Sequence, residues 1–232
     1  MGILNKRGIL NKGGYYEGGY YMPILNEISV QLQNGKAKIV KQLVEQALAD
    51  GVTPQEILDA GLLAGMGVIG AKFKNNEVYV PEVLIAARAM NTGVEVIKPL
   101  LAKDGVKSNS KVCLGTVKGD LHDIGKNLVK IMMEGKGIEV VDIGIDVPTK
   151  KFIEVAIKEN CQVIACSALL TTTMGEMKYV VEEMQNAGIR EKIKIMVGGA
   201  PVTQAFCDQI GADCYTVDAA SAAEAAIRLC ES

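Results

Sequence analysis

Histidine is almost absent from this sequence, because His122 is the single imidazole in 232 residues. A zinc enzyme normally supplies three protein ligands to its metal, and a metal hydrolase of the His-Asp kind needs several histidines. The six cysteines do not compensate, since they form no Cys-x-x-Cys pair and have no zinc-like spacing. The composition therefore excludes both kinds of metalloenzyme.

Long apolar runs, basic clusters and nucleotide-binding loops are also missing. No apolar run reaches the roughly 18 to 20 residues of a membrane span, and no signal-peptide pattern opens the chain. The net charge is −2 without a Lys/Arg stripe, which argues against nucleic acid or an anionic membrane as partner. Neither G-x-G-x-x-G nor a Walker loop follows the first predicted strand, which disfavours a nicotinamide or nucleotide enzyme. We expect a cytoplasmic protein whose partners are proteins or a small molecule.

The cysteines that are present lie mostly inside apolar runs such as VIACSALL at 163–170. We therefore expect buried, reduced thiols rather than disulfides or metal ligands. The six are Cys113, Cys161, Cys166, Cys207, Cys214 and Cys230.

The first 21 residues repeat themselves: GILNK occurs at 2–6 and 8–12 and is followed by GGYYEGGYY. Short Gly/Tyr repeats cannot build a core by themselves. We expect residues 1–21 to be a disordered tail or a vector-derived lead.

Residues 22–103 have helical periodicity and lack strand signals. Apolar residues recur every three or four positions, and Gly35 and Gly51 follow the first two predicted helices. Thr53-Pro-Gln-Glu predicts a capped start for the third helix, and a fourth begins at Pro81. Four helices with short turns predict a bundle.

The third predicted helix is unusually rich in glycine. Each glycine costs up to about 1 kcal/mol relative to alanine inside a helix. We therefore expect close backbone approach along this helix, either to a neighbouring helix or to a bound ring. The glycines are Gly61, Gly65, Gly67 and Gly70.

The period changes after the Gly/Ser/Asn/Lys-rich linker at 101–111. Short apolar, β-branched runs alternate with helix-like segments, which predicts βα units and a parallel sheet. Ligands of such sheets bind beyond the carboxyl ends of the strands. The five runs are VCLGTV, GIEVVDIG, CQVIACSA, KIKIMVGG and DCYTV.

The segment after the first predicted strand, KGDLHDIGKN at 118–127, holds the only histidine. By itself it is compatible with a metal site, a phosphate loop, a helix start or one ligand to a cofactor that brings its own metal, and a lone histidine is often structural. A metal already held in four positions by a macrocycle would need only one imidazole.

Three motifs stand in the order and spacing of a family signature: Asp120-x-His122-x-x-Gly125, Ser167-x-Leu169 and Gly198-Gly199. On these, the chain resembles corrinoid (cobalamin)-binding methyltransferase subunits, similar to methyl-carrier corrinoid proteins and the cobalamin module of methionine synthase. The resemblance covers roughly residues 24–232. It implies an α/β fold class, with a four-helix bundle cap domain at 22–103 and, at 104–232, a Rossmann-like (flavodoxin-like), doubly wound, five-stranded parallel sheet that binds the corrinoid.

The resemblance implies that His122 is the axial cobalt ligand of cobalamin or a related corrinoid, whose benzimidazole-like tail enters a deep slot. Asp120 would accept a hydrogen bond from the other ring nitrogen, and Thr173 would continue this relay where methionine synthase has serine. Asp123 has no assigned role. Residues expected to bind the cofactor are Gly125, Ser167, Leu169, Thr171, Gly198 and Gly199.

The family also places an apolar helical lid over the corrin, which protects reduced cobalt from water and oxygen. We expect the lid to swing on the 101–111 linker. Helical spacing alone fits bundle core equally well. The residues expected over the corrin are Met66, Phe73, Tyr79, Val80, Leu84 and Met90.

The function implied is that of a methyl carrier without catalytic residues of its own. It would accept a methyl group on cobalt from a substrate:corrinoid methyltransferase and deliver it to a second methyltransferase that uses tetrahydrofolate or a thiol. A reductive activating protein is the third expected partner. The methyl donor is not identified by the sequence.

Three alternatives compete with this function. A carbon-skeleton mutase subunit would lack the helical cap. A cobalamin-dependent sensor would need an output domain, for which we expect neither the first 21 residues nor the C-terminus to have room. A storage or trafficking role for the corrinoid remains open.

Overall fold

The computed structural model describes residues 22–103 and 110–232 of the chain. The repeated segment at 1–21 and most of the predicted linker lie outside the described residues. The predictions of a tail and of a hinge therefore also fall outside the described residues.

Four helical rods form the N-terminal part, as the apolar periodicity predicted. They are α1 (Met22–Gln33), α2 (Ala37–Ala49), a continuous third rod made of α3 (Pro54–Glu56), the π-helical η1 (Ile57–Leu63) and α4 (Ala64–Lys74), and α5 (Val80–Lys103). The predicted helix start at Thr53 is present as a capping box, since Glu56 N donates to Thr53 Oγ1 and Thr53 N donates to the Glu56 carboxylate. Within the described ranges, no helix is both long and apolar enough to cross a membrane.

The glycines of the third rod have different surroundings. A Cβ at Gly61 would lie 3.1 Å from the Ile28 side chain, and a Cβ at Gly65 would lie 3.0 Å from the Ser29 carbonyl oxygen. A Cβ at Gly67 would meet no atom within 4 Å. Close approach to a neighbouring helix therefore holds for Gly61 and Gly65, which pack on α1, and not for Gly67.

The C-terminal part is a parallel five-stranded sheet in the order β2-β1-β3-β4-β5, the flavodoxin-like order. All five predicted runs are strands: β1 (Lys111–Val117), β2 (Glu139–Val147), β3 (Val163–Ser167), β4 (Lys194–Gly198) and β5 (Cys214–Thr216). The connecting helices are α6 (Ile124–Glu134), α7 (Thr149–Lys158), α8 (Glu176–Asn186), α9 (Gln204–Ile210) and α10 (Ala219–Cys230). The predicted fold class is confirmed.

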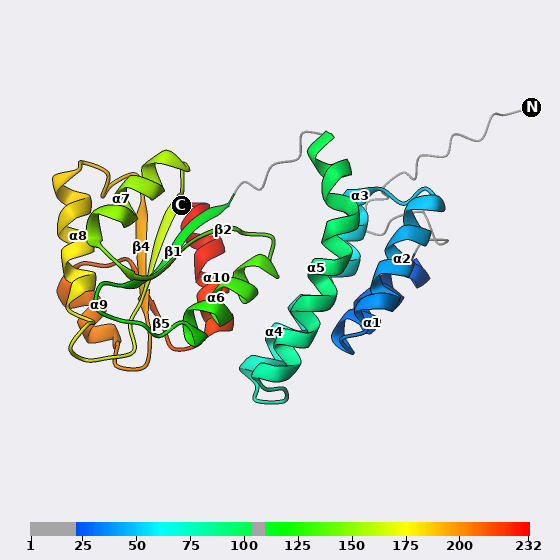
Figure 1. The fold of residues 1–232 in the computed structure, drawn as a ribbon, viewed down its shortest axis with the longest axis horizontal. Coiled ribbons are helices and arrows are strands. Elements are labelled where there is room, and N and C mark those ends of the chain that lie inside the picture. The colour runs from blue at the N-terminus through cyan, green and yellow to red at the C-terminus, as the bar shows by residue number, and fades with distance from the viewer. Residues whose placement is uncertain (1–21, 104–109) are drawn as a thin grey trace, which may run out of the picture.

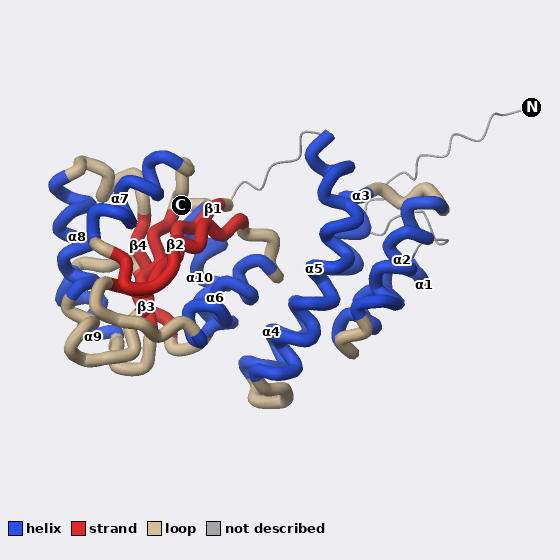
Figure 2. Tube along the Cα trace, viewed as in Figure 1, coloured by secondary structure: helices blue, strands red, loops and turns tan. Residues whose placement is uncertain are grey.

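The sheet lies between two helical layers (Figures 1 and 2). Helices α7, α8 and α9 close one apolar core, whereas α6 and α10 cover the opposite face. The core on the α6/α10 face continues into the helical bundle, so the two parts of the chain share it.

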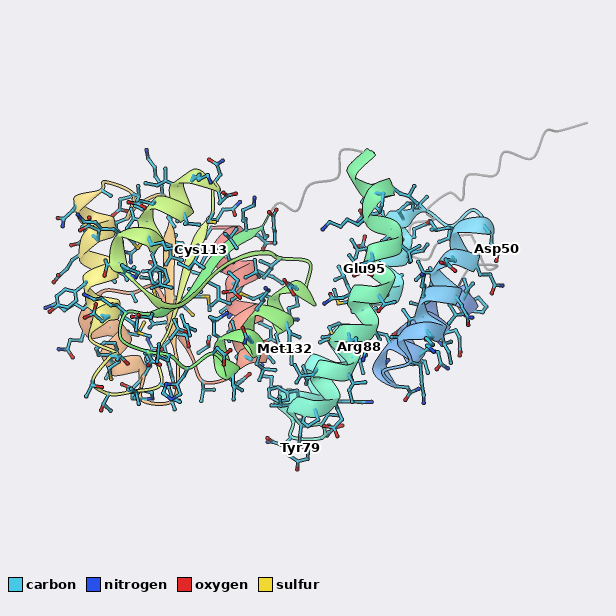
Figure 3. All side chains as sticks on the ribbon, viewed as in Figure 1. Asp50, Tyr79, Arg88, Glu95, Cys113 and Met132 are labelled. Atoms are coloured by element: carbon cyan, nitrogen blue, oxygen red, sulfur yellow. The ribbon has the colours of Figure 1, made fainter. Side chains whose placement is uncertain are left out.

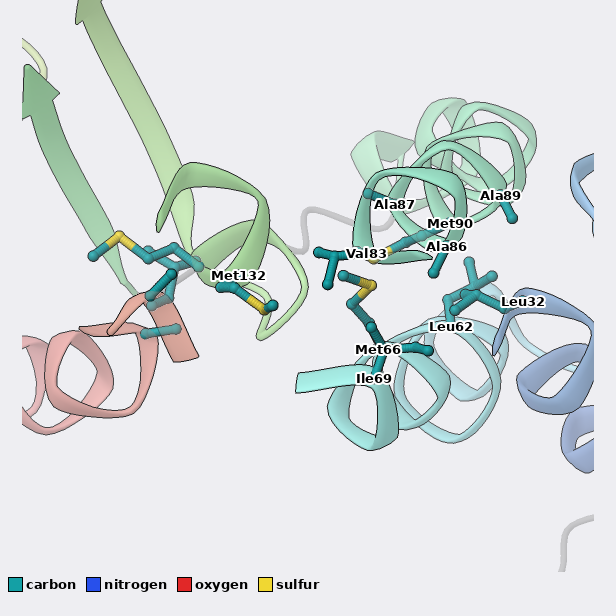
Figure 4. Packing of buried hydrophobic residues seen from close by; sticks show 14 of the residues in the cluster. Leu32, Leu62, Met66, Ile69, Val83, Ala86, Ala87, Ala89, Met90 and Met132 are labelled. Carbon is teal, nitrogen blue, oxygen red and sulfur yellow. The ribbon is translucent and has the colours of Figure 1, made fainter. Parts of the chain in front are cut away.

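The bundle packs on the outer side of α6 and α10 through α4 and α5 (Figure 1). Met132 of α6 faces Met66 of α4 (Figure 4), and a Cβ at Gly135 would overlap the Met66 side chain. Lys74 and Glu224 form an ion pair of 2.9 Å across the same contact. The absence of a side chain at Gly135 therefore lets the bundle approach α6.

All six cysteines are free thiols, four of them buried, as the sequence predicted. Burial raises the pKa of Cys113 to about 12 and that of Cys161 to about 11. These two groups remain protonated and unreactive near neutral pH.

Two substitutions in α4 test the close approach to α1. Gly65→Ala should destabilise the cofactor-free protein, because overpacking against the Ser29 backbone costs about 1–3 kcal/mol. Gly67→Ala, in the same helix but in open space, should be neutral or stabilising by up to about 1 kcal/mol. Urea unfolding followed by circular dichroism measures both changes, and equal effects of the two variants would contradict the packing described.

Candidate functional site

The strands end together at one edge of the sheet and bring distant loops into contact. Thr116, Ser167, Gly198 and Thr216 are paired across β1, β3, β4 and β5 and form a row at this edge. The loop that carries His122 follows β1 and leads into α6. The predicted position of the site beyond the carboxyl ends of the strands is therefore where these loops meet.

Asp120 is fully buried in this loop and accepts five hydrogen bonds. Its Oδ1 accepts from the backbone N of His122 at 3.0 Å and from His122 Nδ1 at 2.7 Å. Its Oδ2 accepts from the Thr173 hydroxyl at 2.7 Å and from the backbone N atoms of Leu169 at 2.8 Å and Leu170 at 3.3 Å. One carboxylate thus joins the loop after β1 to the loop after β3.

These contacts determine the charge of the carboxyl group. Burial by itself raises the pKa of Asp120, but the hydrogen bonds from Thr173, Leu169 and His122 outweigh burial and hold that pKa well below its ordinary value. Asp120 is therefore a carboxylate and can only accept hydrogen bonds.

The tautomer of His122 follows from this charge. Because Nδ1 faces a carboxylate, Nδ1 carries a proton, and in the neutral ring Nε2 keeps a free lone pair. The side chain is half exposed, and no described residue forms a hydrogen bond with Nε2. The backbone is also held, since the buried Thr116 hydroxyl donates to the His122 carbonyl oxygen at 2.9 Å. His122 therefore presents a fixed, unshared nitrogen at the edge of the sheet.

A slot of about 270 Å³ opens beside this loop, between the sheet and helices α6 and α10. Of the residues predicted to bind a cofactor, Gly125, Ser167, Gly198 and Gly199 line it. A Cβ at Gly125 would meet no atom within 4 Å, so this glycine leaves free space at the start of α6. Gly199 has a positive φ of 128°, and a Cβ there would overlap the Ala168 carbonyl oxygen. The missing side chain therefore allows the loop after β4 to pass close to the backbone of the loop after β3.

Leu169 and Thr171 lie outside the lining of the slot and are exposed. Leu169 instead reaches the site through its backbone N–H, which binds Asp120. Contact of either side chain with a cofactor stays a prediction.

The six residues expected over a corrin divide into three kinds. Met66 and Met90 are buried in the shared apolar core, and Met66 packs on Gly135, at the opposite end of α6 from His122. Phe73 and Val80 are partly buried, whereas Tyr79 and Leu84 are exposed, Tyr79 at the tip of the turn between α4 and α5 (Figure 3). Their position over a cofactor stays a prediction.

Sequence reasoning missed two polar contacts of the site. One is the Thr116 hydroxyl, which has no recognisable motif of its own. The other is Lys126, buried at 3% exposure, whose Nζ lies 2.6 Å from Asp142 Oδ2 and which lines the slot. A lysine next to the motif glycine was visible in the sequence, but its partner on β2 depends on the tertiary structure.

The described residues contain no group of three His, Cys, Asp or Glu that could hold a metal ion by itself. One imidazole with a free Nε2, beside a slot, suits a metal whose other ligands come from an organic ring. The open space at Gly125 and the small residues of the strand-end row fit a planar group entering between sheet and helices.

Comparisons with known proteins agree with this geometry. Two family models described as B12 binding domains match residues 24–98 and 110–228. Trimethylamine corrinoid protein 1 of Methanosarcina acetivorans is 47% identical over 77% of this chain and 83% of its own length. Dimethylamine corrinoid protein 1 of the same organism is 43% identical over 86% of this chain and 93% of its own length.

A solved structure extends the likeness to the arrangement of both parts. The methanol:cobalamin methyltransferase complex from Methanosarcina barkeri matches with a TM-score of 0.81 and 30% identity, over 90% of this chain and 80% of that chain. The likeness thus covers the helical bundle as well as the sheet.

Substitutions at Thr173 test the hydrogen bond to Asp120. Thr173→Val should destabilise the cofactor-free protein by about 1.5–3 kcal/mol, because a buried carboxylate loses a charge-assisted partner. Thr173→Ser keeps the hydroxyl and should lose only about 0.8 kcal/mol for its missing methyl group. Urea unfolding compares the two, and a Ser variant as unstable as the Val variant would show that the hydroxyl is unimportant.

Proposed function

This chain belongs to the B12-binding corrinoid proteins and is a corrinoid-binding methyl carrier, and we propose that its methyl donor is a methylamine. The relatives that support this proposal are named for trimethylamine and dimethylamine and are 47% and 43% identical to the chain. The solved complex named for methanol is 30% identical. The carrier role places the chain in a methyltransferase system, with methyltransferases as its partners.

The observation that supports the corrinoid-carrier role is the single imidazole fixed by a buried carboxylate beside an open slot. In the proposed assignment, Nε2 of His122 would ligate cobalt and the residues of the slot would hold the nucleotide tail of the corrinoid. When bound, the corrinoid supplies a cobalt ion that can take up and give off a methyl group.

Each protein group then has a defined task. Asp120 keeps the proton on Nδ1, which fixes the tautomer and orients the ring so that Nε2 is available as a ligand. Thr173 and the Leu169 amide hold the carboxylate in place from the other loop. Thr116 fixes the backbone of His122, so the imidazole is preorganised before a cofactor binds.

The remaining assignments are part of the same proposal. We infer that the methyl acceptor is tetrahydrofolate or a thiol, reached through a second methyltransferase, and that a reductive activating protein is a further partner. We place the domain boundary between residues 103 and 104, with the helical cap before it. The two family matches lie on either side of this boundary and support it.

Methyl transfer with separate donors tests the proposed substrate. The corrinoid-loaded chain is mixed with purified trimethylamine-, dimethylamine- or methanol-specific methyltransferase and its substrate. Absorbance of the bound corrinoid reports methylation. We expect methylation with at least one methylamine and none with methanol, and transfer from methanol alone would contradict the methylamine assignment.

The ligand role of His122 is tested by the visible spectrum of the bound corrinoid. His122→Ala should lose the spectral signature of a nitrogen lower ligand and bind the corrinoid roughly 10-fold more weakly or worse. Asp123→Asn is the matched control, since the exposed Asp123 side chain accepts a hydrogen bond from the Asn127 side chain and has none with His122 or Asp120. Identical spectra for wild type and His122→Ala across the pH range would remove His122 as the ligand.

A further inference from the structure

We propose that the slot selects corrinoids by their lower base, preferring a methylated benzimidazole to adenine. This inference rests on the proposed function, because it takes the slot as the place where the detached base lies. The inference depends on the walls of the slot, whose side chains are small or polar at the mouth and apolar at the floor.

Two neighbouring rows of the sheet create this gradient. The row at the mouth is Thr116, Ser167, Gly198 and Thr216. Two residues earlier on each strand, the register pairs Leu114 with Ala165, and Ala165 with Met196. Two residues of a parallel strand rise by roughly 6.6 Å, about the width of one aromatic ring. A bicyclic base that passes the mouth would therefore place its outer ring against the apolar row.

The side chains of the floor offer neither a hydrogen-bond donor nor an N or O acceptor to such a ring. Leu114, Ala165 and Met196 are at most 4% exposed and have no polar side-chain N or O atoms. Strands β3 and β4 are paired on both sides, so their backbone groups are used within the sheet. On the helix side, Ala219 and Ala222 of α10 complete the wall.

Two of the polar side chains that line the slot, Lys126 and Asp218, are already engaged. The Lys126 ammonium, which can only donate, binds Asp142 and Asn127. Asp218 caps α10 by accepting from the backbone N and the hydroxyl of Ser221, both at 2.8 Å. The remaining polar side chains of the described lining, Ser167 and Thr216, belong to the row at the mouth, so neither lies in the apolar row that would meet the far end of a base.

The chemistry of the two bases then decides the preference. The six-membered ring of adenine carries an exocyclic amine and two ring nitrogens, where dimethylbenzimidazole carries only carbon, hydrogen and two methyl groups. Polar atoms buried without partners weaken binding, here by roughly 10-fold to 100-fold. The methyl groups would instead pack on the apolar row.

Binding of three corrinoids that share one ring system tests the preference. The cofactor-free full chain is titrated with the dimethylbenzimidazole form, the adenine form and cobinamide, which has no base. Each Kd is corrected for the fraction of free cofactor whose own base is detached from cobalt, read from its spectrum. We expect the dimethylbenzimidazole form to bind at least about 10-fold tighter than the adenine form after this correction.

The possible failures have different meanings. Equal or tighter binding of the adenine form would overturn the inference, and so would a dimethylbenzimidazole form no tighter than cobinamide. Failure of all three corrinoids to bind would instead contradict the proposed function.

Two serine variants in the slot test the inference directly, and a third outside the slot is their control. Ala165→Ser adds a hydroxyl to the floor and should shift the ratio of the two Kd values toward adenine by several fold. Ala222→Ser does the same from the α10 wall, in case the first variant folds poorly. Ala226→Ser, equally buried on α10 but outside the lining of the slot, should leave the ratio unchanged. An unchanged ratio in both slot variants would also overturn the inference.

Discussion

The buried carboxylate of Asp120 is the interaction on which the site depends. Its oxygens accept from His122 on one side and from Thr173 and the Leu169 amide on the other, which joins two loops about 50 residues apart. A buried carboxylate without partners would be strongly unfavourable, so these donors must be in place whenever the chain is folded. The imidazole is consequently oriented by the fold itself, and a cofactor does not need to order it.

The parallel sheet makes this interaction possible, because its strands all end at the same edge. The edge brings small and hydroxyl side chains together at Thr116, Ser167 and Gly198. One layer below, the same strands present only apolar side chains, and the alanines of α10 leave space between helix and sheet. The polar edge that holds the His122 loop and the apolar floor of the slot thus arise from positions two residues apart on the same strands.

The helical bundle depends on the same side of the sheet. Its core is continuous with the core under α6 and α10, and Met66 reaches α6 where Gly135 has no side chain. The ion pair between Lys74 and Glu224 is partly exposed and contributes little by itself. Apolar packing therefore carries most of the attachment of the bundle.

The sequence by itself determined the elements and the identity of the ligand-bearing loop. Local periodicity defines helices and strands, and the scarcity of histidine left His122 as the one imidazole available. Only the tertiary structure decided that Thr116 holds the His122 backbone, that Lys126 pairs with Asp142 and that Met66 faces α6. The physical reason is that periodicity tells which face of an element is buried, whereas strand register and helix packing decide which side chains meet there.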